Sequence, residues 1–178
     1  MKPVKPVGAL LFPAVCTVGF CLGLEAGSFQ YVLLKIAAEV SLDKTMMGSL
    51  VSVQFFGVMI CPLLAGRISD RVSKKRIAAI FLLVFSAGCL LCGKSPGTGA
   101  FMAGIFVVGG AFTTAQNATI AALTDVYGTR SGKYVNICQC LYSFGAVSGP
   151  ILASGLIAVS YTHLVTGGKP EMILHGLA

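Results

Sequence analysis

The sequence predicts an all-α membrane protein with five transmembrane helices. Hydrophobic residues make up 56% of the 178 positions, charged residues make up 11%, and the mean hydropathy is +0.87. A soluble domain carries charge on about a quarter of its residues, so this composition indicates a chain that resides in a bilayer. The charges gather between apolar stretches close to or above the ~20 residues that a helix needs to cross the hydrocarbon. Helices are expected there because backbone groups in lipid must bond within their own segment.

Charged residues divide the chain into five predicted spans. The first span is interrupted only by Glu25, and the other four contain no charge. The third span is the shortest and lies near the lower limit for a membrane crossing. A short N-terminus of residues 1–7 precedes the spans, and a polar tail of residues 161–178 follows them. The spans are predicted at residues 8–34, 46–66, 77–93, 99–124 and 134–160, within one helical bundle of residues 8–160.

The distribution of basic residues predicts the orientation of the chain. Lysine and arginine accumulate on the cytoplasmic side of membrane proteins. The N-terminus and the loops on its side carry nine basic residues, against four on the other side, which predicts a multi-pass protein of the cytoplasmic membrane with its N-terminus inside. The net charge of +7 therefore reflects topology and not nucleic-acid binding. The nine are Lys2, Lys5, Arg67, Arg71, Lys74, Lys75, Arg76, Arg130 and Lys133, and the four are Lys35, Lys44, Lys94 and Lys169.

Five of the nine basic residues on the predicted cytoplasmic side lie in one loop between the second and third spans, "GRISDRVSKKR". A glycine, an acid and several bases follow one another there in a fixed order, at Gly66, Asp70, Arg71, Lys74 and Lys75. This order resembles the loop 2–3 signature of the major facilitator superfamily, G-x-x-x-D-R-x-G-R-K, with Ser73 in place of its second glycine. The resemblance implies the N-terminal six-helix bundle of a transporter, of which this chain holds five helices.

The same resemblance implies that this loop is a gating loop, which holds one state of the transporter and rearranges during alternating access. Asp125, at the cytoplasmic end of the fourth span, is the predicted partner of Arg71. The alternative is an exposed ion pair that contributes less than about 1 kcal/mol and has no gating role.

Amide and hydroxyl side chains recur at helical spacing within the apolar spans, above all in the fourth and fifth. Lipid penalises such groups, so they are expected to face a cavity or another helix. The candidates for lining a substrate cavity are Gln30, Gln54, Thr113, Gln116, Asn117, Asn136, Gln139 and Ser143.

Two of these polar strings carry a narrower resemblance. T-T-A-Q-N at residues 113–117 and N-x-x-Q-x-x-x-S-F-G-A at residues 136–146 resemble helices four and five of the L-fucose permease family of sugar–proton symporters. This implies a secondary active transporter that moves a small polar solute, a sugar, by alternating access. Gln30 and Thr113 stand where that family is expected to carry embedded carboxylates, which departs from its proton-coupling pattern.

Glu25 is the single acid embedded in a predicted span. An ionised carboxylate at that depth costs several kcal/mol, so the side chain is expected to face the bundle interior or a water-filled cavity. Glu25 is therefore the candidate for proton or cation coupling. The alternative is a protonated glutamic acid that bonds to a neighbouring helix.

Glycines at four-residue spacing predict close helix packing in the first and fifth spans. They are Gly19, Gly23 and Gly27 in the first span, and Gly145 and Gly149, followed by Pro150, in the fifth. The Gly145-x-x-x-Gly149-Pro150 string also resembles the helix-five motif of drug–proton antiporters in the same superfamily. Efflux of drugs or metabolites is therefore the alternative transport function, and a membrane scaffold without transport is a further alternative.

Metal, cofactor and enzyme signatures are absent from the sequence. The seven cysteines include one C-x-x-C at Cys89 and Cys92, but no second pair follows at zinc spacing. There is no phosphate-binding loop, no nucleophile elbow and no catalytic carboxylate pair. The expected partners are a small solute, protons, the bilayer and a missing C-terminal half. We expect the tail of residues 161–178 to be truncated or non-native sequence.

Overall fold

A computed structural model of the chain describes residues 6–39, 43–69, 72–95 and 97–166, and these residues form helices without any strand. This confirms the all-α prediction. The α-helices are α1 (Pro6–Glu39), α2 (Lys44–Ser69), α3 (Lys74–Gly93), α4 (Thr98–Tyr127) and α5 (Ser131–Thr166), and a short 3₁₀ helix, η1 (Gly128–Arg130), joins α4 to α5.

Each predicted span lies inside one of these helices, but α5 ends later than expected. It continues past residue 160 to Thr166, through the first residues of the predicted polar tail. No glycine or proline occurs between Tyr161 and Thr166, whereas the Gly-Gly pair at 167–168 follows at once, so nothing in the local sequence ends the helix earlier. The rest of the predicted tail lies outside the described residues.

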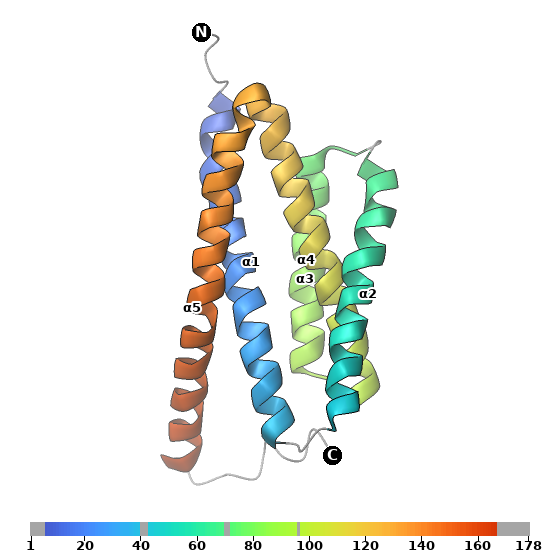
Figure 1. The fold of residues 1–178 in the computed structure, drawn as a ribbon, viewed down its shortest axis with the longest axis vertical. Helices are drawn as coiled ribbons and strands as arrows, with labels where there is room; N and C mark the ends of the chain where they lie inside the picture. The colour runs from blue at the N-terminus through green and yellow to red at the C-terminus, as the bar shows by residue number, and fades with distance from the viewer. Residues whose placement is uncertain (1–5, 40–42, 70–71, 96, 167–178) are drawn as a thin grey trace.

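The number of membrane-crossing segments differs from the prediction in one respect. Four helical stretches of the described chain are long and apolar enough to cross a membrane: Leu10–Lys35, Lys44–Arg67, Lys74–Gly93 and Thr98–Val159. The count is four and not five because η1 joins α4 and α5 into one uninterrupted helical stretch. Figure 1 shows that the chain reverses at this connection, so α4 and α5 run in opposite directions.

Two sets of helices make up the bundle. In Figure 1, α5 packs along α1 on one side, and α4 packs against both α2 and α3 on the other. The contacts of α4 with α1 and with α5 involve fewer residues. The buried residues of α4, from Gly104 to Leu123, are mostly glycine, alanine and other small residues, which lets neighbouring backbones approach closely.

Glycines set the spacing of the α1–α5 interface. A side chain added at Gly23 would overlap the backbone of Tyr142, and one at Gly27 would overlap the backbone of Ala146. From the other side, additions at Gly145 and Gly149 would overlap carbonyl oxygens of α1. The predicted packing glycines of the two helices therefore face the opposing helix. A Cβ added at Gly19 would make only an ordinary contact with α5, at 3.5 Å from the carbonyl oxygen of Cys138. The ring of Pro150 lies against Gly27.

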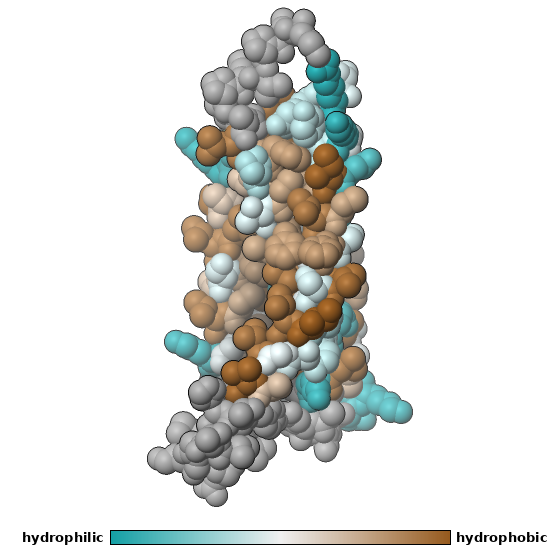
Figure 2. All heavy atoms as spheres, turned by 90° about the vertical axis from the view of Figure 1, so that its left-hand side faces the viewer, coloured by the Kyte–Doolittle hydropathy of each residue, from teal (hydrophilic) through white to brown (hydrophobic). Residues whose placement is uncertain are grey.

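The molecular surface has a wide apolar band. Figure 2 shows this band between two ends where hydrophilic residues gather. Large hydrophobic side chains such as Leu83, Phe144, Val147 and Leu156 are mostly exposed. Exposed apolar area on this scale is expected of a surface that contacts lipid, so the fold supports an integral membrane protein.

Candidate functional site

A cavity of about 300 Å³ lies between α1, α3 and α4, and Glu25 is the one carboxylate among the residues that line it. Among the described residues, no lysine, arginine or histidine lines the cavity, and most of its surface is apolar. The lining residues are Glu25, Phe29, Val32 and Leu33 of α1, Cys89, Cys92 and Gly93 of α3, and Phe101, Ile105 and Val108 of α4.

The packing of α1 explains why Glu25 reaches this cavity. Side chains three or four residues apart share a helix face, so Glu25 and Phe29 lie on the same face of α1. Gly23 and Gly27 lie on another face, which is packed against α5. Because α5 covers the glycine face, the half-buried carboxylate points toward α3 and α4. The prediction that Glu25 faces the bundle interior agrees with this position.

The predicted cavity-lining polar residues do not join Glu25. None of the eight is among the residues that line its cavity. Gln30 is exposed on α1, and Gln54 packs on α2 against Gly109. Asn136, Gln139 and Ser143 are exposed on α5, and Gln116 is half-buried on α4. Asn117 lines a separate cavity of about 160 Å³ between α2, α3 and α4, together with Gly66 and Lys74.

The hydroxyl groups in this predicted set bond to their own helices. Thr113 Oγ1 donates to the carbonyl oxygen of Gly109 at 3.1 Å, and Ser143 Oγ donates to that of Gln139 at 3.0 Å. Thr114 and Thr119, which are buried, do the same to Gly110 and Ala115. These hydroxyls therefore have a partner without any solute.

Sequence reasoning missed most residues of the Glu25 cavity. The recurrence of apolar side chains at positions 29, 32 and 33 after Glu25 indicates a shared face of α1 and could have identified that wall. The α3 and α4 walls of the cavity depend on how the helices pack. The sequence around Cys89 or Phe101 does not reveal this packing.

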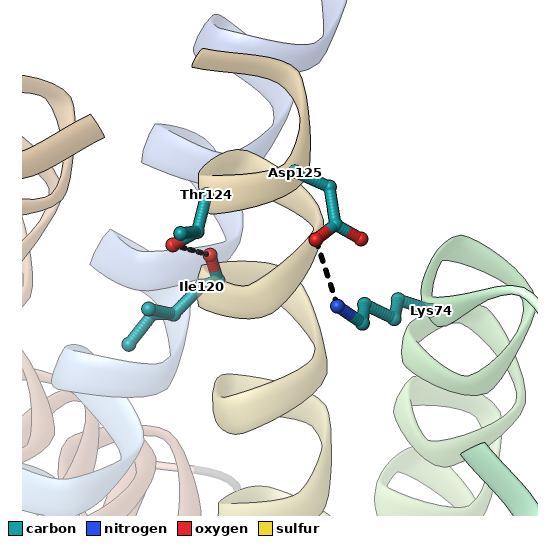
Figure 3. Close-up of polar contacts among 4 residues, drawn as sticks. All are labelled: Lys74, Ile120, Thr124 and Asp125. Atoms are coloured by element: carbon teal, nitrogen blue, oxygen red, sulfur yellow. Dashed lines mark hydrogen bonds and ion pairs between the residues drawn. The ribbon is translucent and has the colours of Figure 1, made fainter. Parts of the chain in front are cut away.

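One ion pair of the described residues lies where the predicted gating loop meets α3. Lys74 Nζ lies 2.8 Å from Asp125 Oδ1, with side chains that are 38% and 57% exposed. Figure 3 shows Lys74 extending from the start of α3 to Asp125 near the end of α4. The predicted partner of Asp125, Arg71, lies outside the described residues, as does Asp70. Lys75 is exposed and lines a cavity of about 290 Å³ beside this pair.

Comparison with known sequences identifies the family. Residues 15–167 match the family model described as the Major Facilitator Superfamily.

The chain belongs to the Major Facilitator Superfamily. Members of this family are transporters that move small solutes across membranes, and they are not enzymes. The superfamily predicted from the gating loop is thus confirmed. The L-fucose permease family, which the fourth and fifth spans resemble, is not supported by the relatives found.

The chain is similar to curated transporters of two kinds. It is 23% identical to the 4-hydroxybenzoate transporter PcaK of Acinetobacter baylyi, over 92% of this chain and 37% of that protein. It is 25% identical to the multidrug resistance protein MdtL of Klebsiella pneumoniae, over 83% of this chain and 38% of that protein. The chain therefore spans less than two fifths of the length of these relatives. No solved structure gives a significant match.

Proposed function

We propose that this chain is part of a secondary transporter that moves amphiphilic small molecules across the cytoplasmic membrane by alternating access, with Glu25 as the coupling residue. The observation that carries the proposal is the cavity between α1, α3 and α4, in which one carboxylate stands among apolar and aromatic walls.

The chemistry of this cavity selects its ligand. A carboxylate inside apolar walls is costly when ionised and alone, so it favours either a proton or the positive charge of a bound solute. The rings of Phe29 and Phe101 would contact the apolar body of such a solute. Exchange of a proton for a cation at Glu25 would couple solute movement to the proton gradient.

The relatives support an amphiphilic solute over a sugar. Their names specify an aromatic acid for one and multiple drugs for the others. A sugar site needs several free donors and acceptors, whereas the hydroxyls of Thr113 and Ser143 already bond to their own helices. We therefore favour efflux of amphiphilic compounds, the alternative raised by the glycine motif of the fifth span.

Sugar transport remains the second candidate, and one observation favours it. The amides of Asn136 and Gln139 are exposed on α5, within a chain whose surface is otherwise widely apolar. Lipid would penalise both amides, so in the full-length protein they would border a polar solute pathway against a further part of the transporter.

Transport by the full-length protein in proteoliposomes tests the proposal. Tetraphenylphosphonium, 4-hydroxybenzoate and L-fucose are offered separately, each with and without a pH gradient. We expect gradient-driven movement of the lipophilic cation and a loss of at least about tenfold in Glu25→Gln, because the amide cannot exchange a proton. The control is Asp43→Asn, which changes an exposed acid before α2 and should leave the rate unchanged. Transport of fucose alone would refute the amphiphile proposal in favour of the second candidate.

A further inference from the structure

Two cysteines from different helices meet in the core of the α1–α5 interface. Cys16 Sγ of α1 lies 3.4 Å from Cys138 Sγ of α5, close enough for one thiol to donate a hydrogen bond to the other sulfur. Cys138 is buried in a cluster with Val15 and Leu123, and Cys16 is half-buried against the same cluster. The two residues are far apart in sequence, so only the helix packing brings their sulfurs together.

The glycine spacing of α1 holds this pair in register. Gly19 lies one turn after Cys16, and a Cβ added there would come to 3.5 Å from the carbonyl oxygen of Cys138. The closer approaches at Gly23 and Gly27 continue the same interface along α1. The backbone of α5 is thus fixed beside α1 at the level of the two thiols.

From this geometry we infer that Cys16 and Cys138 form an oxidation site, at which a neutral lipid-soluble hydroperoxide converts the two thiols into a disulfide between α1 and α5. The sulfurs need to approach by roughly 1.4 Å to reach disulfide bonding distance. Rotation of the two side chains can supply much of that approach, so the helices keep their packing.

The reaction balances with the hydroperoxide as the only co-reactant. Cys16, the less buried thiol, attacks a peroxide oxygen, the O–O bond breaks, and the departing alkoxide takes the thiol proton and leaves as an alcohol. Cys138 then attacks the sulfur of the sulfenic acid on Cys16, and the hydroxyl group leaves as water with the second thiol proton. Two electrons pass from the thiols to the hydroperoxide.

The other cysteines provide matched controls. Cys21 and Cys140 occupy the same two helices but are exposed. Cys89 and Cys92 belong to one helix, α3, and line the Glu25 cavity. Selective oxidation of Cys16 and Cys138 would therefore follow from their juxtaposition and not from residence on a particular helix.

The test uses membranes that contain the wild-type chain, treated with tert-butyl hydroperoxide. The protein is then denatured and labelled with a polyethylene glycol maleimide, which counts the free thiols. We expect the seven adducts of the untreated chain to fall by two, and the two to return after reduction. Mass spectrometry of the unreduced digest should show the peptides of Cys16 and Cys138 joined.

Two variants separate this pair from the other thiols. The double variant Cys21→Ser/Cys140→Ser should still lose two adducts on oxidation. Cys138→Ser should form no cross-link and should leave a sulfenic acid on Cys16 that dimedone traps. The inference is wrong if the wild-type chain keeps seven free thiols, if the mapped disulfide joins another pair, or if it joins two copies of the chain. These outcomes do not depend on whether the protein transports amphiphiles.

Discussion

Hydroxyl and carboxyl side chains in a transmembrane helix differ in whether the helix itself can satisfy them. A helix interior offers carbonyl oxygens to nearby side-chain donors, but its N–H groups are already used. Thr113, Thr114 and Ser143 donate to carbonyls of their own helices. The ionised carboxylate of Glu25 can only accept, so it requires a proton, a cation or a donor from outside α1. This contrast distinguishes Glu25 from the hydroxyl-bearing residues of the spans.

Removing the hydroxyl groups that bond to their own helices should have little effect on transport. We expect Thr113→Val and Ser143→Ala to keep the transport rate of the full-length protein within about twofold, because neither hydroxyl is free for a solute. Initial uptake rates in proteoliposomes measure this, with Glu25→Gln as the inactive reference. A tenfold loss in either variant would show that the hydroxyl leaves its helix to bind solute.

The ion pair of Lys74 and Asp125 should contribute little to stability. Both side chains are more than a third exposed, so water screens their attraction. A double-mutant cycle with Lys74→Met and Asp125→Asn should give a coupling free energy below about 1 kcal/mol. Unfolding by denaturant in detergent micelles measures it. A coupling of several kcal/mol would instead indicate that this pair fastens α3 to α4.

Among the elements, α1 and α5 pack closely through glycines on both helices. Gly23 and Gly27 of α1 face Gly145 and Gly149 of α5, and the backbones approach closely on both sides. Without a hydrophobic driving force in lipid, such close packing supplies much of the association. The same interface turns Glu25 toward its cavity, so helix packing and the candidate site are linked.

A large side chain at this interface should therefore destabilise the protein. We expect Gly149→Leu to lower the free energy of unfolding by about 1–3 kcal/mol, since the new side chain would overlap the carbonyl oxygen of Leu24. Gly155→Leu is the matched control on the same helix, where nothing lies within 4 Å of an added Cβ. Thermal unfolding in detergent compares the two. Equal stability would show that α5 does not pack on α1 through this face.

For the molecule as a whole, we predict that α3, α4 and α5 each cross the bilayer separately, with the orientation that the distribution of basic residues predicts. Gly99 and Gly132 each lie in the first turn of a helix, α4 and α5, and both are exposed with open space around them. Because α4 and α5 run in opposite directions (Figure 1), these two positions lie at opposite ends of the bundle.

Cysteine labelling at these positions tests the five-span topology with an inside N-terminus. In a background without native cysteines, a membrane-impermeant maleimide should label Gly99→Cys in intact cells and Gly132→Cys only after permeabilisation. The opposite result would reverse the orientation. Labelling of both from one side would mean that α4 does not cross the membrane.

Charge placement is why the sequence predicted the helices well. Charged residues flank the first four spans and the start of the fifth, and the loop from Gly66 to Lys75 carries a specific family pattern. The helix faces were harder to predict, because lipid and protein interior are both apolar and little periodicity distinguishes them. The partner of Asp125 was also beyond the sequence, since the loop carries several bases and their order along the chain does not tell which one contacts the carboxylate. The sequence predicted that Glu25 faces the interior, because an ionised carboxylate is costly in lipid. Its apolar surroundings depend on how α1, α3 and α4 pack, which the sequence did not reveal.

The packing of α1 against α5 has a consequence for biosynthesis. During synthesis α2, α3 and α4 follow one another and can pack as soon as α4 is inserted, because α2 and α3 both make their main contacts with α4. By contrast α1 must wait in the bilayer until α5 emerges before its glycine face is covered. The helix that carries Glu25 is therefore made before α2, α3 and α4 but is fully packed only after them, so its stretch of the nascent chain is where we expect membrane chaperones to bind.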